Sequence, residues 1–260
     1  MIAGVASGIG EGLAALYLRD GASVTGTYRS SIDKARIAPA ITSYCVDITR
    51  PQDISTIVAE LRTHGYRWDV LISSIGTLTP IGGFLNTDFG EWKRSFETNY
   101  FGQLDLVHSL RPLSRANATV VLFTGGAPGG VLPSFSAYSV AKIALTKMVE
   151  YLDAEDPDVK YLIVGPGWVN TKIHAQTLEA GEAAGGNLHR TRDFLTAGKP
   201  GTPMEDIYGC INWLVEQPKQ VVGGRNFSVV WDAWGTRPQS DTLLRRLADN
   251  PALFKLRRYE

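Results

Sequence analysis

The chain has 260 residues, with 26 basic and 26 acidic side chains and a formal net charge of zero. This length suits one domain with a sizeable buried core, and the neutral balance argues against nucleic acid or an anionic membrane surface as a partner. No apolar run approaches membrane-spanning length. Cys45 and Cys210 have neither metal-ligand nor redox spacing, and Met1 leads directly into a glycine motif. We therefore expect a cytoplasmic protein with reduced thiols and no signal peptide.

The first predicted element is a short strand that turns into a helix through a glycine-rich stretch, AGVASGIG at residues 3–10. Leu13, Leu16 and Tyr17 continue the stretch with the apolar spacing of a helix. A pyrophosphate can approach such a helix start closely, because the free N–H groups and the helix dipole favour an anion. Alone, such a stretch is more often only a turn. The residues expected to bind a dinucleotide here are Gly4, Ser7, Gly8, Ile9 and Gly10.

Strand and helix patterns then alternate along the chain. Continuous apolar runs such as residues 120–123 are typical of strands buried on both faces, as a parallel sheet requires. No repeat, linker or break in composition divides the chain, so the pattern predicts a single α/β domain over residues 1–260. The further strands are expected at residues 24–27, 41–46, 68–73, 118–123, 159–164 and 226–230.

The end of the second strand bears on the choice of cofactor. An acidic side chain at this place binds the ribose hydroxyls of NAD and repels a 2′-phosphate. Here Tyr28 occupies that place, followed by Arg29 and Ser30, a guanidinium and a hydroxyl that suit a phosphate. The pattern favours NADP, with NAD possible, although Arg29 could also be solvated or could stack on the adenine of either cofactor.

Further along, Tyr138 and Lys142 are four residues apart in a predicted helix and so share one face. A nearby ammonium favours the phenolate, so we expect the pKa of Tyr138 to fall from near 10 toward working pH. Such a tyrosine is a general acid/base toward an alcohol or ketone. The pair alone could equally be a surface tyrosine and a solvated lysine.

A third motif, PGWVNT at residues 166–171, follows a buried strand and forms a turn where open α/β sheets bind ligands. Residues 174–203 carry five glycines and little apolar periodicity, which predicts a substrate loop over the site, or else a plain surface loop. A short helix is expected at residues 243–253. The C-terminal extension, residues 235–260, is assigned to subunit contact or to the rim of the site.

Taken in this order, the motifs resemble the short-chain dehydrogenase/reductase family of the single-domain kind, from residue 1 to about residue 235. Its patterns are TGxxxGxG, with Ala3 here in place of Thr, then YxxxK and PGxxxT. The glycine turn before Tyr138 and the tail WDAW at residues 231–234 are similar to one subgroup. The resemblance implies a three-layer α-β-α sandwich around a doubly wound, mostly parallel sheet, the Rossmann fold. It also implies hydride transfer between a nicotinamide and a small carbonyl or alcohol substrate, in a homodimer or homotetramer.

The same resemblance assigns the site residues. Tyr138 protonates the nascent alkoxide, Lys142 binds the nicotinamide ribose, and Asn99 holds a water in the proton relay. The family's Asn-Asn-Ala-Gly is here Ser-Ser-Ile-Gly at residues 73–76, and Asp47 is expected to contact the adenine unless it is only a turn residue. The remaining residues assigned to the cofactor are Ile48, Ser74, Gly76, Pro166, Gly167, Val169 and Thr171.

One departure concerns the catalytic serine, which the family places thirteen residues before Tyr138, where this chain has Gly125. Thr124, one residue earlier, is the candidate to orient the substrate oxygen, unless it is a buried strand-end threonine and the serine site is empty. Two other classes stay open: a non-catalytic or regulatory cofactor-binding protein, and a sugar-nucleotide-modifying enzyme. The scattered histidines predict no metal site.

Overall fold

Seven parallel strands form one sheet in the order β3-β2-β1-β4-β5-β6-β7 in the computed structural model, which describes residues 1–6, 8–125, 130–197 and 201–257. The chain begins in the middle, moves outward to β3 and then restarts on the other side of β1 with β4. This doubly wound order confirms the predicted three-layer α/β sandwich, and in open sheets of this kind the ligand crevice is expected beyond the ends of strands such as β1 and β4, where the strand order reverses. The strands are β1 (Ile2–Ala3), β2 (Thr25–Tyr28), β3 (Thr42–Cys45), β4 (Trp68–Ser73), β5 (Ser114–Phe123), β6 (Lys160–Gly165) and β7 (Arg225–Ser228).

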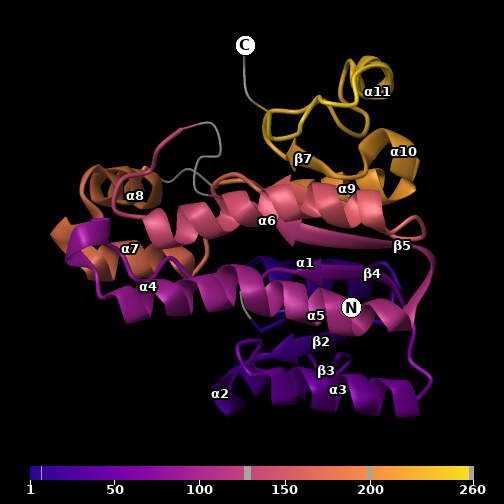
Figure 1. The fold of residues 1–260 in the computed structure, drawn as a ribbon, viewed down its shortest axis with the longest axis horizontal. Helices are drawn as coiled ribbons and strands as arrows, with labels where there is room; N and C mark the ends of the chain where they lie inside the picture. Colours follow the sequence, from indigo (N-terminus) through magenta and orange to yellow (C-terminus); the bar gives the residue numbers. More distant parts are fainter. Residues whose placement is uncertain (7, 126–129, 198–200, 258–260) are drawn as a thin grey trace.

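Helices cover both faces of the sheet, and in Figure 1 α5 and α6 cross in front of it while α1 lies behind. The longer helices are α1 (Gly8–Arg19), α3 (Pro51–Thr63), α4 (Phe89–Phe96), α5 (Gly102–Leu110), α6 (Ser136–Glu155), α7 (Ile173–Ala180), α8 (Gly186–Thr196), α9 (Met204–Glu216) and α11 (Ser240–Asp249). The short ones are α2 (Ser31–Lys34), α10 (Lys219–Val222), the 3-10 turns η1 (Phe84–Asn86), η3 (Arg111–Leu113) and η4 (Gly181–Ala184), and the π-helix η2 (Glu97–Phe101).

The two cores follow from the alternation of side chains along the strands. On β5, Val120 and Leu122 pack in the core shared with α3, α5 and α6. Val121 and Phe123 point to the opposite face and pack in the core shared with α1, α9 and α11. A strand buried on both faces thus explains the continuous apolar run in the sequence.

Residues 174–203 are mostly helical, which corrects the expectation of a loop without regular structure. They include most of α7, then η4 and α8, while residues 198–200 lie outside the described residues. Figure 1 shows α7 and α8 at the end where the strands finish, beside α4 and the first turns of α6. We call residues 173–196 the lid. It lies at the edge of the sheet that holds the predicted site.

The C-terminal helix packs on the sheet of its own chain. Leu243 and Leu247 of α11 are buried in the core that contains β7. Arg225 of β7 is almost fully buried, and its guanidinium donates to the carbonyl oxygens of Leu247 at 2.6 Å and Asn250 at 3.1 Å. These bonds satisfy carbonyls at the end of α11. The predicted role of this region in subunit contact or at the rim of the site stays a prediction.

Candidate active site

The glycine-rich turn joins β1 to α1 at the crevice. Gly4 has φ +89°, a conformation that glycine adopts readily, and a Cβ on Gly10 would overlap the carbonyl oxygen of Gly4. Ser74, after β4, donates a hydrogen bond to the carbonyl oxygen of Ala3 at 2.9 Å. This bond ties the turn to the end of β4. Ser7, also predicted to bind the cofactor, lies outside the described residues.

A hollow of about 370 Å3 lies at the first turn of α1. Its walls are Gly8, Glu11, Gly12, Arg36, Asn170, Thr171 and Lys172. The glycine positions leave room for a ligand close to the backbone, and the N-terminus of a 12-residue helix favours an anion there. Lys172 adds a cationic group that the sequence patterns did not indicate, whereas Arg36 pairs with Glu11 of the same wall at 3.3 Å. The hollow therefore fits the pyrophosphate of a dinucleotide.

The residues predicted to bind the adenosine begin at the end of β2. Tyr28 is buried, whereas Arg29 is exposed, and no carboxylate among the described residues pairs with it. The Ser30 hydroxyl donates to Asp33 at 2.9 Å, so it is already engaged. The exposed guanidinium is therefore the group at this place that is open to a phosphate.

Asp47 and Ile48 follow β3. Asp47 accepts hydrogen bonds from the backbone and hydroxyl of Thr49 at 3.0 and 2.7 Å, which help to hold its pKa below the usual value. The side chain of Ile48 is 4% exposed and packs in the core with α3 and α5. A ligand could therefore contact Ile48 only through its backbone, and the assignment of Ile48 to the cofactor stays a prediction.

Tyr138 and Lys142 lie one turn apart near the start of α6, as the spacing predicted. The Nζ atom of Lys142 is 5.9 Å from the centroid of the Tyr138 ring and donates to the Ile75 carbonyl oxygen at 3.4 Å. Burial lowers the pKa of Lys142 to about 8 and raises the pKa of Tyr138 to about 12. The expected fall in the Tyr138 pKa is therefore wrong for this arrangement, because loss of solvent around the phenol dominates.

Asn99 is fully buried in the π-helix η2. Its side-chain oxygen accepts from the backbone N–H of Thr77 at 3.0 Å, and its side-chain nitrogen donates to the Thr77 carbonyl at 2.9 Å. Gln103 donates to the backbone carbonyl of Asn99 at 2.7 Å and accepts from Ser73 at 2.9 Å. The sequence analysis missed Gln103 because no motif marks it, and it gave no role to Ser73, although Ser73 begins the Ser-Ser-Ile-Gly stretch.

Gly76 brings Asn99 and Lys142 to one place. A Cβ on Gly76 would lie 3.4 Å from the side-chain oxygen of Asn99 and 3.8 Å from Nζ of Lys142. The two polar groups therefore face the same stretch of backbone after β4. This arrangement is compatible with the predicted relay from Lys142 through Asn99.

Thr124 and Gly125 follow β5 and differ in what they face. The Thr124 hydroxyl is buried and lies 3.2 Å from the hydroxyl of Thr146. Gly125 instead meets the Tyr138 hydroxyl, since a Cβ at this position would overlap it. The geometry does not support the predicted role of Thr124 in orienting a substrate oxygen, because its hydroxyl already has a partner in the interior.

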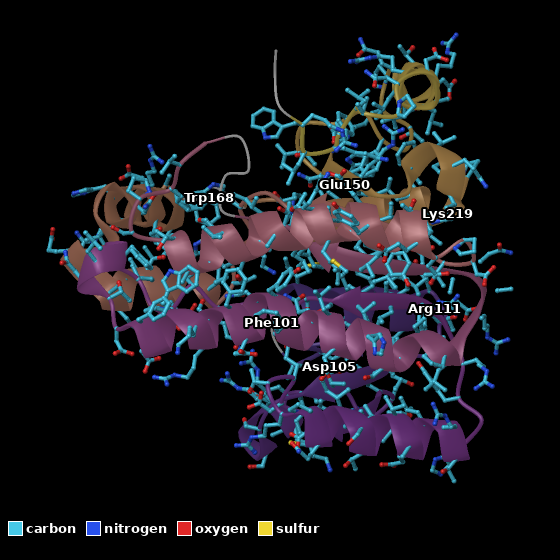
Figure 2. The ribbon with its side chains drawn as sticks, in the orientation of Figure 1. Phe101, Asp105, Arg111, Glu150, Trp168 and Lys219 are labelled. Carbon is cyan, nitrogen blue, oxygen red and sulfur yellow. The ribbon has the colours of Figure 1, made fainter. Side chains whose placement is uncertain are left out.

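The motif at residues 166–171 forms the turn after β6. Gly167 has φ +75°, and Trp168 accepts a hydrogen bond on its carbonyl oxygen from Thr202. The Trp168 ring is 46% exposed and stacks on His174 of the lid with ring centroids 5.3 Å apart. Figure 2 shows Trp168 between α8 and the rest of the fold. His174 also donates to the carbonyl oxygen of Val169 at 2.9 Å, so the lid is tied to this turn.

A second tie joins the lid to the segment after β4. The side-chain oxygen of Gln176 accepts from the Leu78 N–H at 2.9 Å, and its nitrogen donates to the Thr77 hydroxyl at 3.1 Å. Thr77 is the residue whose backbone binds Asn99. The lid and the buried asparagine therefore share one partner.

A larger hollow, of about 890 Å3, lies away from these residues on the face covered by α5 and α6. Phe101, Asp105 and Arg111 line it and follow one another along α5 and its ends in Figure 2. Ile48 is the one predicted site residue in its lining. Across the described residues, no helix is both long and apolar enough to cross a membrane, and no three His, Cys, Asp or Glu side chains are grouped for a metal ion.

A doubly wound sheet with a glycine turn at its switch point is the arrangement of a dinucleotide-binding fold, and the Tyr138–Lys142 pair lies at the same edge of the sheet. The family model described as Enoyl-(Acyl carrier protein) reductase matches residues 4–230. The chain belongs to the short-chain dehydrogenase/reductase family.

Individual relatives agree with this family. An uncharacterized oxidoreductase of Schizosaccharomyces pombe is 30% identical over 150 residues, which cover 56% of this chain and 60% of that protein. The 11-beta-hydroxysteroid dehydrogenase 1A of Arabidopsis thaliana is 28% identical over 226 residues, 83% of this chain and 64% of that protein. The chain thus spans less than two thirds of the length of either relative. The crystal structure of the YIR035C short chain dehydrogenase/reductase from Saccharomyces cerevisiae has a TM-score of 0.77 at 23% identity and covers 98% of both chains.

Proposed function

We propose that this chain catalyses hydride transfer between a nicotinamide dinucleotide and the carbonyl or alcohol carbon of a small molecule, with Tyr138 as the general acid/base. The observation that carries the proposal is the grouping of Tyr138, Lys142 and Asn99 at the carboxyl edge of the sheet, beside the glycine turn. Tyr138 and Lys142 are neighbours on α6, and the fold brings Asn99 of η2 to the same place. A surface tyrosine with a solvated lysine does not explain a lysine that is 2% exposed.

In the reduction direction, the bound nicotinamide supplies the hydride. Tyr138, whose pKa is about 12, holds its proton at neutral pH and donates it to the oxygen that becomes the alcohol. Lys142 places its ammonium beside the phenol ring, and its charge stabilises the phenolate that remains. Asn99 fixes the backbone at Thr77 and so supports the segment that Lys142 contacts at Ile75.

The residues proposed to hold the cofactor follow the crevice from end to end. Gly4, Gly8 and Gly10 allow the pyrophosphate to approach the backbone of α1, with Lys172 and Arg36 as its cationic neighbours. The adenosine end is assigned to Tyr28, Arg29, Ser30 and Asp47, and the nicotinamide end to Ser74, Gly76, Pro166, Gly167, Val169 and Thr171.

NADP is the proposed cofactor rather than NAD. Arg29 is exposed and has no carboxylate partner among the described residues, so it can bind a 2′-phosphate without breaking an existing ion pair. Tyr28 leaves no negative charge at the place where NAD-specific chains carry an acid. The substrate is proposed to be a small molecule, and a homodimer or homotetramer remains the expected assembly.

The test of the proposed function is to follow nicotinamide absorbance with NADPH and a panel of aldehydes and ketones, and with NADP and the matching alcohols. We expect carbonyl-dependent oxidation of NADPH that is absent without protein. A protein that binds NADPH tightly but turns over no carbonyl or alcohol would contradict the proposal.

A non-catalytic cofactor-binding protein is the second candidate, and Gly125 is the observation that favours it. With glycine here, the chain lacks the side-chain hydroxyl that the family places opposite Tyr138. The same absorbance experiment separates the two candidates, because a sensor would bind NADPH without oxidising it.

A further inference from the structure

The surroundings of Tyr138 contain an apolar cluster built from three separate segments. Its buried members are Leu78 after β4, Phe135 before α6, and Ala184 and Leu188 of the lid, and the Tyr138 ring packs against them. Partly buried side chains complete the cluster, namely Ile81, Leu132, Ile173 and Ala180. A molecule that reaches the Tyr138 hydroxyl from the lid side therefore meets hydrocarbon.

The charged side chains of the lid, and Lys172 just before it, are exposed to solvent. Seven ionisable residues from Lys172 onward are exposed: Lys172, Glu179, Glu182, His189, Arg190, Arg192 and Asp193. His174 is the ionisable group that turns inward, and burial lowers its pKa, which favours the neutral ring. The other polar groups of the lid that turn inward are uncharged: Thr177 and Thr191 are buried, and the amide of Gln176 has both ends bonded to Thr77 and Leu78.

Among the residues that the structure describes, the two polar side chains grouped with Tyr138, Lys142 and Asn99, offer no free counter-ion to an anionic substrate. Lys142 is 2% exposed and lies behind the phenol ring, where its ammonium already contacts the Ile75 carbonyl. Asn99 is fully buried and both ends of its amide bind Thr77. A carboxylate or phosphate near the reacting carbon would thus lose its water without gaining a partner, which is strongly unfavourable.

We propose, on the basis of the proposed function, that the substrate is an uncharged, apolar carbonyl compound, and that the lid selects it by excluding ionised groups from the Tyr138 cluster. A half-exposed indole supports an aromatic substituent on that substrate. Trp168 stacks against His174 and Phe194, with ring centroids 5.3 and 4.9 Å away, and still leaves 46% of its surface open. Flat rings pack favourably on such a surface.

The test uses para-acetylbenzoate and its methyl ester, which share a ketone and a para carbonyl substituent but differ in charge. With NADPH present, we expect kcat/KM for the ester to exceed that for the acid by about 100-fold or more, because the acid buries an unpaired charge. Thermal stabilisation of the NADPH complex measures binding independently of turnover. We expect the ester to raise Tm and the acid to leave it unchanged.

A paired substitution locates the effect on the lid. Ile173→Lys places a cation in the cluster and is expected to reduce the preference for the ester at least tenfold, since the carboxylate then has a partner. Leu178→Lys is the control, because Leu178 is 39% exposed on the same helix and lies outside the cluster. The Leu178→Lys protein should prefer the ester over the acid by the same factor as the parent protein.

The outcomes separate the two proposals. Equal turnover or equal stabilisation by the ester and the acid, or no stabilisation by the ester, would overturn the substrate class. Selective stabilisation by the ester without any oxidation of NADPH would support the substrate class and contradict the proposed catalysis.

Discussion

The hydroxyl of Tyr138 occupies the volume in which a Cβ on Gly125 would stand. The family pattern places a serine at this position, yet here no side chain can be added without moving either the tyrosine or the turn after β5. The loss of the serine and the position of the phenol are therefore linked. The position of the Tyr138 hydroxyl in this structure therefore requires a glycine at residue 125.

This relationship predicts that Gly125→Ala lowers kcat for carbonyl reduction by at least about tenfold, because the added methyl displaces the phenol that donates the proton. Gly125→Ser is expected to do the same rather than to restore activity. Gly130→Ala is the control, since a Cβ there would meet no atom of the described residues within 4 Å. An increase in kcat for Gly125→Ser would show that the serine site is vacant and accessible.

Thr124→Val tests the alternative source of a hydroxyl. The Thr124 hydroxyl is bonded to Thr146 in the interior, so its loss is expected to reduce the free energy of unfolding by about 1 kcal/mol and to leave kcat within about twofold. Denaturant unfolding and steady-state kinetics measure the two effects separately. A large loss of kcat with unchanged stability would return Thr124 to the role predicted from the sequence.

The two shifted pKa values predict the pH dependence of reduction. Tyr138 stays protonated up to a pKa of about 12, whereas Lys142 loses its charge above a pKa of about 8. We expect kcat/KM for reduction to be level below pH 8 and to fall above it, because the neutral amine no longer stabilises the phenolate.

Lys142→Arg is expected to remove that fall, since a guanidinium remains charged throughout the range. Lys147→Arg, in a partly exposed ion pair with Glu150, should leave the profile unchanged. If kcat/KM of the Lys142→Arg protein still falls at the same pH, the fall is caused by a group other than Lys142.

Arg29→Ala tests the choice of cofactor. A charge-assisted contact to phosphate contributes roughly 1.5–3 kcal/mol, so the parent protein should bind NADPH about ten- to a hundredfold more tightly than NADH. Arg29→Ala should weaken the binding of NADPH but not of NADH, and so remove most of that difference. Arg62→Ala on α3 is the control and should leave the difference unchanged. Direct titration of each protein with NADPH and with NADH measures the two Kd values. Equal Kd values in the parent protein would contradict the assignment of NADP as the cofactor.

Most of the fold could be predicted because turn residues separate continuous apolar runs. The strand at Trp68–Ser73 has the predicted bounds, whereas β5 begins at Ser114, four residues before the predicted start. Residues 114–117 are polar or exposed, so they carry no apolar signal although Ser114 pairs with Trp68. Gly181 and Gly185, both with positive φ, divide the lid into short helices and so hide its periodicity.

The site could be predicted only where the residues belong to a motif. Gln176 binds Thr77 and Leu78 across 99 and 98 residues, and no local pattern announces such a contact. The spacing in the sequence also places Lys142 beside Tyr138, but it does not show how far the two side chains are buried from solvent. The pKa of Tyr138 rises because of burial, which includes packing against lid residues distant in sequence.

Tyr138→Phe, compared with the parent protein in a single turnover of NADPH with a carbonyl that the parent reduces, tests the central claim most directly. The substitution removes one hydroxyl and keeps the ring that packs in the apolar cluster. Since general acid catalysis contributes about 10²–10⁴-fold, we expect the rate to fall by that factor while the Kd for NADPH stays within about twofold. A Tyr138→Phe protein that reduces the carbonyl at the parent rate would contradict the account.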